Sequence, residues 1–340
     1  MACNDPLRGF VIINSDGTKE IKVTGRNIKR LELYSDGKYR QSDTDWRSPS
    51  CIKEINTYID IPCGKCMGCR LDYSTMWADR MMLELQYHDS AYFLTLTYND
   101  ENLPEGEYID NDGVINKSHS LIKRDLQLFI KRLRKSQKNK LMYYACGEYG
   151  DKSARPHYHA IIYSLDIPDL MFYKKGKKGY NYYTSEYLNS VWQLGYVIVG
   201  QVSYDTCAYT ARYITKKQYG KGKEKYERLG IQPEFATMSL RPAIGLAYYQ
   251  DNMERIASLD SVSIPTAEGG RQIRPSKYYY SKLEQYDKEM YLKLKEKNET
   301  YLKNKKLIVN ELSDLEYYDI LEVQENTLKA RTKVLRKETI

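Results

Sequence analysis

The sequence has no long apolar run. No segment of its 340 residues approaches the roughly eighteen consecutive apolar side chains of a membrane-spanning helix, and the N-terminal MACNDPLRGF lacks the apolar core of a signal peptide. These absences argue against the integral membrane and secreted classes. With 41% hydrophobic residues the chain can still bury a sizeable core, so we expect a soluble intracellular protein with no membrane partner.

Histidine is also scarce, and two of the four histidines, His157 and His159, stand two residues apart. The apolar run from 155 to 163 is opened by a proline, which predicts a β-strand on which both imidazoles share a face, about 6.6 Å apart at Cα. Glu148 lies upstream at an expected strand end and can add a carboxylate. Two imidazoles and one carboxylate leave coordination positions open, as a catalytic metal requires. Two half-exposed strand histidines without a metal are the simpler alternative.

Three cysteines follow a CxxCxxC spacing at Cys63, Cys66 and Cys69. In an intracellular chain this spacing favours a metal over disulfides. Zinc needs a fourth ligand, which Cys3 or Cys51 can supply. An iron–sulfur cluster is the competing occupant, although the usual following Cys-Pro is absent. Reduced cysteines packed in a loop are the alternative without a metal.

The charge of the chain is positive and unevenly spread. The formal net charge is +8, with lysines and arginines clustered in 123–140, 174–178 and 212–228, and the chain holds 34 tyrosines. Basic clusters beside aromatic rings suit single-stranded nucleic acid, whose phosphates attract cations and whose bases stack on rings. Because acidic residues are abundant too, ordinary solvated charged faces are the alternative.

The order of the expected elements indicates an α+β domain over residues 71–250. Between the first and last strands the order is strand, helix, strand, strand, helix, strand, which is the pattern of a ferredoxin-like domain with one open sheet face. We expect Ser118 or Ser120 to cap the helix that contains residues 122–133. The expected helices are 71–88, 122–133 and 184–194, and the expected strands are 92–98, 141–146, 157–163 and 196–202.

The remaining segments are expected to be simpler. Residues 1–70 read as a small β-rich segment that ends in the cysteine motif. A polar loop is expected at 99–117, and loop and turn followed by a short helix at 229–250. Residues 251–340 read as a linker and a charged, solvated helical tail, because no proline or glycine occurs from 278 onwards.

Residues 207–217 lack glycine and proline, so they can form a helix that carries Tyr209 and Tyr213 on one face, followed by Lys216 and Lys217. With so many tyrosines, about three such pairs arise by chance, so the pair gains meaning only beside a metal. There a phenol oxygen can attack a phosphate that the cation orients, while a lysine favours the phenolate. The products are a 5′-phosphotyrosine and a free 3′-hydroxyl, which can later reseal the strand.

Taken together, these motifs resemble the HUH endonucleases, and in particular the replication initiators of small icosahedral single-stranded DNA phages of the gokushovirus branch of Microviridae. The resemblance covers roughly residues 60–245. The matching segments are 63–70, 93–98, 147–150, 155–159, 209–213 with Lys216 and Lys217, and 234–239.

This resemblance implies rolling-circle replication in the host bacterial cytoplasm. Such an initiator nicks the supercoiled double-stranded replicative form at the origin and stays attached to the 5′ end while host polymerase, with a host helicase, extends the 3′ end. A second tyrosine then cuts and closes the displaced circle. The resemblance also implies an HUH fold with a ferredoxin- or RRM-like antiparallel sheet, and Mg²⁺ or Mn²⁺ held by Glu148, His157 and His159.

Two other functions remain open from the sequence. A plasmid relaxase or a tyrosine transposase of the same superfamily would use similar chemistry, although relaxases usually place the nucleophile near the N-terminus and carry three histidines. A zinc-stabilised single-stranded DNA-binding protein would use the same basic and aromatic surface without any chemistry.

Overall fold

The computed structural model describes residues 3–14, 16–150, 153–176, 179–212, 223–266 and 269–335. These residues form two compact units, one from the described parts of 1–72 and 303–339 and the other from those of 73–302. The mixed α+β architecture is as expected, with nine helices in the described residues. None of these helices is both long and apolar enough to cross a membrane.

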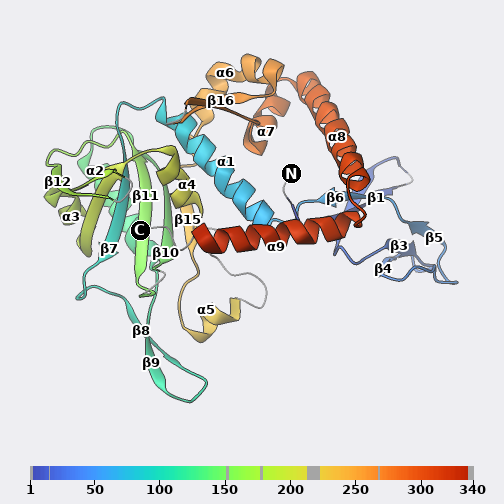
Figure 1. The fold of residues 1–340 in the computed structure, drawn as a ribbon, viewed down its shortest axis with the longest axis horizontal. Helices are drawn as coiled ribbons and strands as arrows, with labels where there is room; N and C mark the ends of the chain where they lie inside the picture. Colours follow the sequence, from blue (N-terminus) through green and yellow to red (C-terminus); the bar gives the residue numbers. More distant parts are fainter. Residues whose placement is uncertain are drawn as a thin grey trace. The chain divides into compact units, whose positions relative to one another are not determined.

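The larger unit is built on a seven-stranded sheet in which every neighbouring pair is antiparallel (Figure 1). The strand order is β12-β13-β14-β7-β11-β10-β15, so β11 lies inside the sheet. The expected ribbon of two strands around the turn after Glu148 is confirmed as β10 and β11. The strands are β7 (Ala91–Tyr98), β10 (Met142–Tyr149), β11 (Pro156–Tyr163), β12 (Met171–Lys175), β13 (Asn181–Thr184), β14 (Gly195–Gln201) and β15 (Phe235–Met238).

Helices cover both faces of this sheet, because successive strand residues point to opposite sides. On β11, Tyr158 and Ile162 join one hydrophobic core, with α2 (Lys123–Ser136) and α3 (Glu186–Trp192). Ile161 and Tyr163 join the other core, on the face that also carries the two histidines. The helices of that second core are α1 (Met67–Leu85), α4 (Tyr204–Arg212), α6 (Leu246–Leu259), α7 (Lys277–Tyr286) and the start of α8 (Lys288–Glu311).

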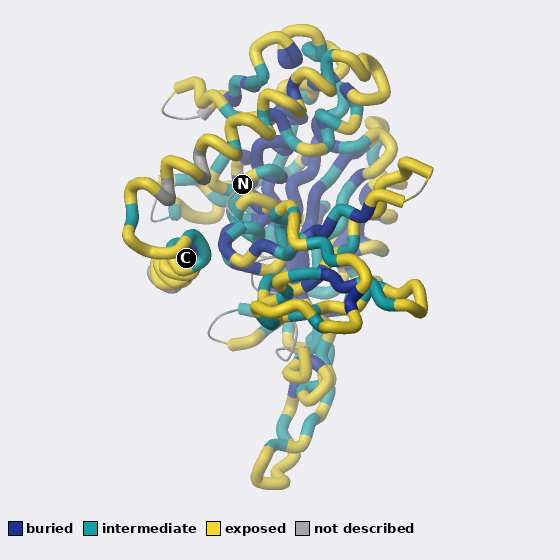
Figure 2. The backbone as a smooth tube through the Cα atoms, turned by 90° about the vertical axis from the view of Figure 1, so that its right-hand side faces the viewer, coloured by how far each residue is buried: buried dark blue, intermediate teal, exposed yellow. Residues whose placement is uncertain are grey.

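Two hairpins and a short helix complete the larger unit. The hairpin of β8 (Glu105–Ile109) and β9 (Ile115–His119) extends away from the sheet and is exposed along much of its length (Figure 2). The polar loop expected at 99–117 was therefore wrong, since a hairpin that meets solvent on both faces needs no apolar alternation. The other elements are β16 (Val262–Thr266), β17 (Gly269–Ile273) and α5 (Glu224–Arg228).

The smaller unit confirms the expected β-structure near the N-terminus. It holds two three-stranded sheets around a small core of Phe10, Ile12 and Leu31. The first sheet has the order β2-β1-β6 and the second β4-β3-β5. Its elements are β1 (Leu7–Ile13), β2 (Lys19–Thr24), β3 (Arg30–Leu33), β4 (Tyr39–Ser42), β5 (Lys53–Ile55), β6 (Tyr58–Ile61) and α9 (Tyr317–Leu335).

Three local expectations were wrong. Helix α2 begins after Ile122 with no side-chain cap, because the Ser120 hydroxyl instead accepts a hydrogen bond from the backbone N–H of Gln232. Part of the expected loop at 229–250 forms β15, which pairs with β10. The C-terminal segment is helical as expected, but α7 is not a solvated tail, since Tyr279 and Leu283 are buried in the larger core.

Candidate active site

The two imidazoles of β11 lie on one face of the sheet, each beside a threonine of β7. His157 pairs with Thr97 and His159 with Thr95 in the antiparallel register. The threonine hydroxyls lie 3.2 Å from His157 Nδ1 and 3.1 Å from His159 Nδ1. Such contacts fix the orientation of a ring and its tautomer. Sequence reasoning missed this role, although the alternation of Thr95 and Thr97 with Leu94 and Leu96 placed both hydroxyls on one face.

Glu148 comes to the same face from the neighbouring strand. It is the cross-strand partner of His157 on β10, and its Oε1 lies 3.0 Å from Nε2 of His159. Glu148 and His159 are each only 4% exposed. A carboxylate this far from water requires a compensating positive charge or strong hydrogen bonds. The structure thus brings together the three residues expected to hold a cation, with the contact of Glu148 to His159 the closest one recorded among them.

Two glycines beside Glu148 leave room for these side chains. A Cβ atom on Gly147 would lie 2.9 Å from Cε1 of Phe235 and 3.0 Å from Cδ2 of Leu121, so those side chains would have to move. A Cβ atom on Gly150 would lie 3.3 Å from Nε2 of His157. Glycine at 150 therefore keeps open the space next to the ring nitrogen of His157 that a metal would contact.

Tyr209 reaches the site from helix α4, which contacts β10 and β11. Its ring centroid lies 5.2 Å from that of His159 at an interplanar angle of 77°, an edge-to-face contact. Phe93 stacks on the same imidazole, with centroids 5.6 Å apart and planes within 5° of parallel, and its ring lies 6.2 Å from Tyr209. The buried side chains of Cys207, Thr210 and Ala211 hold α4 on the core. The phenol of Tyr209 is thus placed beside the candidate metal ligands.

The other expected catalytic residues are Tyr213, Lys216 and Lys217. All three lie outside the residues that the structure describes.

The opposite face of β11 is anchored by a chain of hydroxyl groups. Tyr158, between the two histidines, accepts a hydrogen bond from the N–H of Ile122 (2.8 Å) and donates one to its carbonyl (3.0 Å). Its hydroxyl also lies 2.8 Å from that of Tyr98, which donates to Asp125 at 2.6 Å. Burial raises the pKa of Tyr158 to about 12. This network fixes the histidine strand against the start of α2.

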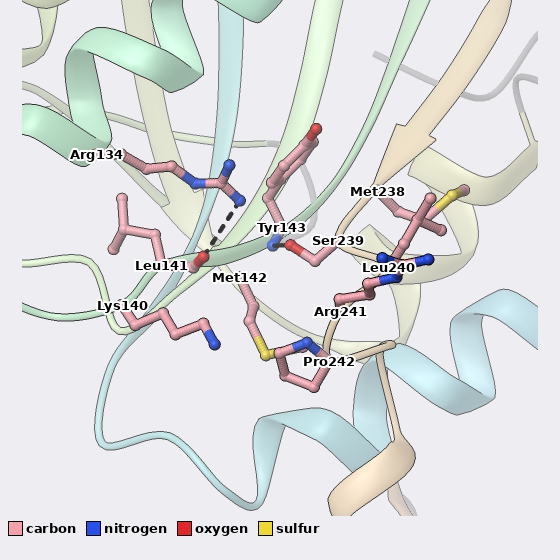
Figure 3. Close-up of a pocket in the computed structure, with 10 residues that line it drawn as sticks. All are labelled: Arg134, Lys140, Leu141, Met142, Tyr143, Met238, Ser239, Leu240, Arg241 and Pro242. Atoms are coloured by element: carbon pink, nitrogen blue, oxygen red, sulfur yellow. Dashed lines mark hydrogen bonds between the residues drawn. The ribbon is translucent and has the colours of Figure 1, made fainter.

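A basic pocket of about 280 Å³ lies at the other end of β10 from Glu148 (Figure 3). The guanidinium of Arg134 lies 5.3 Å from the ring centroid of Tyr143 and 3.5 Å from the carbonyl of Leu141. Three cationic residues and a serine line a cavity that suits a phosphate group. The lining residues are Arg134, Lys140, Leu141, Met142, Tyr143, Met238, Ser239, Leu240, Arg241 and Pro242.

The smaller unit gathers four cysteines, and this group can bind a metal such as zinc. The sulfur atoms of Cys3, Cys63, Cys66 and Cys69 all lie within 4.8 Å of one another. Cys3 supplies the fourth sulfur, whereas Cys51 is outside the group and donates its thiol hydrogen to the carbonyl of Lys53. Among the described residues, no other set of cysteine, histidine, aspartate or glutamate ligands is gathered as tightly.

Comparison with known proteins places the site in a known context. The family model of the replication-associated proteins of the ORF2 type matches residues 91–218, a range that includes Thr95, Glu148, His157, His159 and Tyr209. The chain is 35% identical to the replication-associated protein ORF2 of Spiroplasma virus 4, over 82% of this chain and 85% of that protein. It is 31% identical to the replication-associated protein VP4 of Bdellovibrio phage phiMH2K, over 75% and 79% respectively. No solved structure matches the chain significantly.

Proposed function

Because the chain belongs to this ORF2-type family of phage replication-associated proteins, we propose that it initiates rolling-circle replication as an origin-specific, metal-dependent nickase. The observation that carries this proposal is the meeting of Glu148, His159 and Tyr209 on one face of the sheet. The strands β14-β7-β11-β10, with α2 and α3 on one face, also fit the ferredoxin- or RRM-like sheet of an HUH endonuclease.

Glu148, His157 and His159 suit a catalytic divalent cation such as Mg²⁺ or Mn²⁺. Two imidazoles and one carboxylate leave open positions for a phosphate oxygen, and the threonine hydroxyls hold both rings by Nδ1, which leaves Nε2 for the ion. When bound, the ion would supply positive charge that polarises the scissile phosphate. The buried carboxylate beside His159 supports this assignment, because a cation would compensate its charge.

Tyr209 is the proposed nucleophile. Its phenol oxygen forms a bond to phosphorus, and the bond from phosphorus to the 3′ oxygen breaks. The phenol loses its proton and the departing 3′ oxygen gains one, giving a 5′-phosphotyrosine and a free 3′-hydroxyl. Lys216 or Lys217 would favour the phenolate, since a neighbouring cation stabilises an anion. Tyr213 would act in a second transfer, which cuts the regenerated origin and closes the released circle.

The proposed substrate is the phage replicative form, as a supercoiled duplex whose origin becomes locally single-stranded. The basic pocket of Arg134, Lys140 and Arg241 offers a further contact for a strand phosphate, with Tyr143 at its edge for a base or sugar. Extension of the 3′ end would require a host polymerase and helicase in the bacterial cytoplasm. A relaxase or transposase role is less favoured, because the matched relatives are phage replication-associated proteins.

A non-catalytic single-stranded DNA-binding protein, stabilised by zinc, is the second candidate, which the four-cysteine cluster favours. One experiment separates the two. The full chain is incubated with Mn²⁺ and single strands that tile the origin region of its own phage, and the products are run on a denaturing gel.

A protein band shifted by covalent DNA, absent with a chelator and absent from the Tyr209→Phe/Tyr213→Phe double variant, is the expected result. DNA binding without an adduct on any strand would support the binding protein instead. An adduct that persists in the double variant would place the nucleophile elsewhere.

A further inference from the structure

We propose that Cys3, Cys63, Cys66 and Cys69 bind a single zinc ion, and that this ion orders the contact between the C-terminal helix α9 and the first turn of α1. All of these residues, including those of α9 used below, lie in the smaller unit. The proposal is independent of DNA cleavage.

The spacing of the four sulfurs favours one metal ion over a cluster. Ligands about 2.3 Å from a tetrahedral zinc ion lie about 3.8 Å from one another. Here all four sulfurs lie within 4.8 Å, and those of Cys3 and Cys66 are 3.9 Å apart. The cysteines of an iron–sulfur cluster surround several iron and sulfide atoms and must be spread more widely. The site therefore has room for one ion.

Backbone N–H groups already point at the sulfurs as they do toward thiolates. Cys63 accepts hydrogen bonds from the N–H groups of Lys65 (3.3 Å) and Cys66 (3.2 Å). Cys66 accepts from Asn4 (3.3 Å) and Cys69 (3.4 Å), and Cys3 accepts from Cys63 (3.3 Å). Four thiolates around Zn²⁺ leave two net negative charges, which these donors offset.

The turn that aims these donors depends on Gly64. Its φ of +71° lies in the left-handed region, where a side chain is unfavourable. The chain reverses there, so that the N–H groups of Lys65 and Cys66 face the sulfur of Cys63. The spacing CGKC is thus built as a ligand loop.

Glu325 of α9 connects this site to the C-terminal helix. Its carboxylate accepts the N–H of Met67, the first residue of α1, at 2.9 Å and 3.0 Å, and so caps that helix from another part of the chain. Asn4 joins both features, since its N–H meets Cys66 Sγ and its side-chain amide lies 3.3 Å from Glu325 Oε2. Glu325 is only 8% exposed. Because Met67 directly follows Cys66, loss of the ion would free the turn that Glu325 caps.

The metal is tested first on the purified full chain by elemental analysis and by cobalt replacement. We expect about one zinc per chain, and visible and near-ultraviolet cobalt bands typical of four thiolates. Cys66→Ser and Cys69→Ser should lose the metal, while Cys51→Ser, a buried cysteine of the same unit, should keep it. Iron in place of zinc, or wild-type protein that takes up neither zinc nor cobalt, would overturn the assignment.

The contact of α9 is tested by limited trypsin cleavage at Lys329 and Arg331, with cleavage at Lys117 of the β8–β9 hairpin as an internal reference. We expect chelation of the zinc to speed cleavage of α9 about fivefold or more, as loss of a helix cap would. Glu325→Ala should do the same while keeping one zinc per chain. Glu322→Ala, an exposed glutamate one turn earlier, should change neither quantity. Cleavage of α9 that chelation leaves unchanged would overturn the link.

Discussion

The ring of Tyr209 meets the imidazole of His159 edge to face, with the centroids 5.2 Å apart, and the same imidazole lies against Glu148. A helix and two strands far apart in sequence thus bring a phenol to a buried pair of candidate metal ligands. We expect Tyr209→Phe to reduce the covalent adduct strongly and Tyr213→Phe to leave part of it, because only the first phenol is placed beside His159 in the described residues.

The adduct assay of this prediction needs a matched control. Tyr196 lies on β14 and is 63% exposed, so Tyr196→Phe should behave as wild type. If Tyr209→Phe retained the full adduct, the edge-to-face contact would have no catalytic meaning.

Removing a threonine hydroxyl should weaken the cation site without removing a ligand. Thr97→Val keeps the shape of the side chain but deletes the contact to His157 Nδ1, so we expect Mn²⁺ affinity to fall roughly 10- to 100-fold. Manganese titration followed by electron paramagnetic resonance measures this change. Thr237→Val, which deletes a hydroxyl on β15 near Tyr143, is the control and should keep wild-type affinity. Equal affinities of the two variants would count against the threonine role.

The basic pocket should contribute a phosphate contact. We expect Arg241→Ala to weaken binding of single-stranded DNA about equally across sequences and to lower the slope of log affinity against log salt by about 1. Fluorescence anisotropy at several salt concentrations measures both quantities. Arg40→Ala removes an exposed arginine paired with Asp36 in the smaller unit and should leave the slope unchanged. An unchanged slope for Arg241→Ala would remove the pocket from the DNA-binding surface.

The hydroxyl network behind the histidines should stabilise the fold. Tyr158→Phe deletes the partner of the Ile122 N–H and carbonyl, so we expect the free energy of unfolding to fall by about 1–3 kcal/mol. Urea denaturation measures the loss. Tyr187→Phe, which deletes a hydroxyl close to Ser136 and Gln137 at the surface, should cost less. Equal losses would mean that the network adds nothing beyond an ordinary hydrogen bond.

Buried tyrosines should make the protein sensitive to base. Burial raises the pKa of Tyr158 to about 12, above the value near 10 of an unfolded chain. A raised folded pKa stabilises the protein fully below pH 10, and this stability is lost as the pH rises through 12. We expect the free energy of unfolding to drop between these values, and Tyr158→Phe to reduce the drop. A flat profile would contradict the prediction.

The central fold was readable from the sequence because its elements follow simple periods. The alternation in 93–98 and 157–163 predicted β7 and β11, and the apolar stripe of 122–133 predicted α2. The edge strand β15 escaped because four residues that pair with β10 on one side only carry little periodic signal. The fourth sulfur could be narrowed only to Cys3 or Cys51, since their sequence distance from Cys63 says nothing about where the chain returns.

The contacts within the candidate site were less predictable than its residues. Sequence spacing placed His157 and His159 on one face, yet it did not reveal the diagonal contact of Glu148 with His159 or the stacking of Phe93. Those contacts depend on how β7, β10 and β11 are aligned with one another. Alignment between strands arises from packing across the whole sheet, which no local pattern encodes.

The alternation along β11 also limits how this protein can change over generations. Every second side chain faces the imidazole side, and those between them belong to the core under α2 and α3. Inserting or deleting one residue ahead of His157 would turn both imidazoles into an apolar interior and push Tyr158 toward the nucleic acid. Viral descendants should therefore tolerate length variation in the turn before Arg155 far more readily than anywhere within the strand itself.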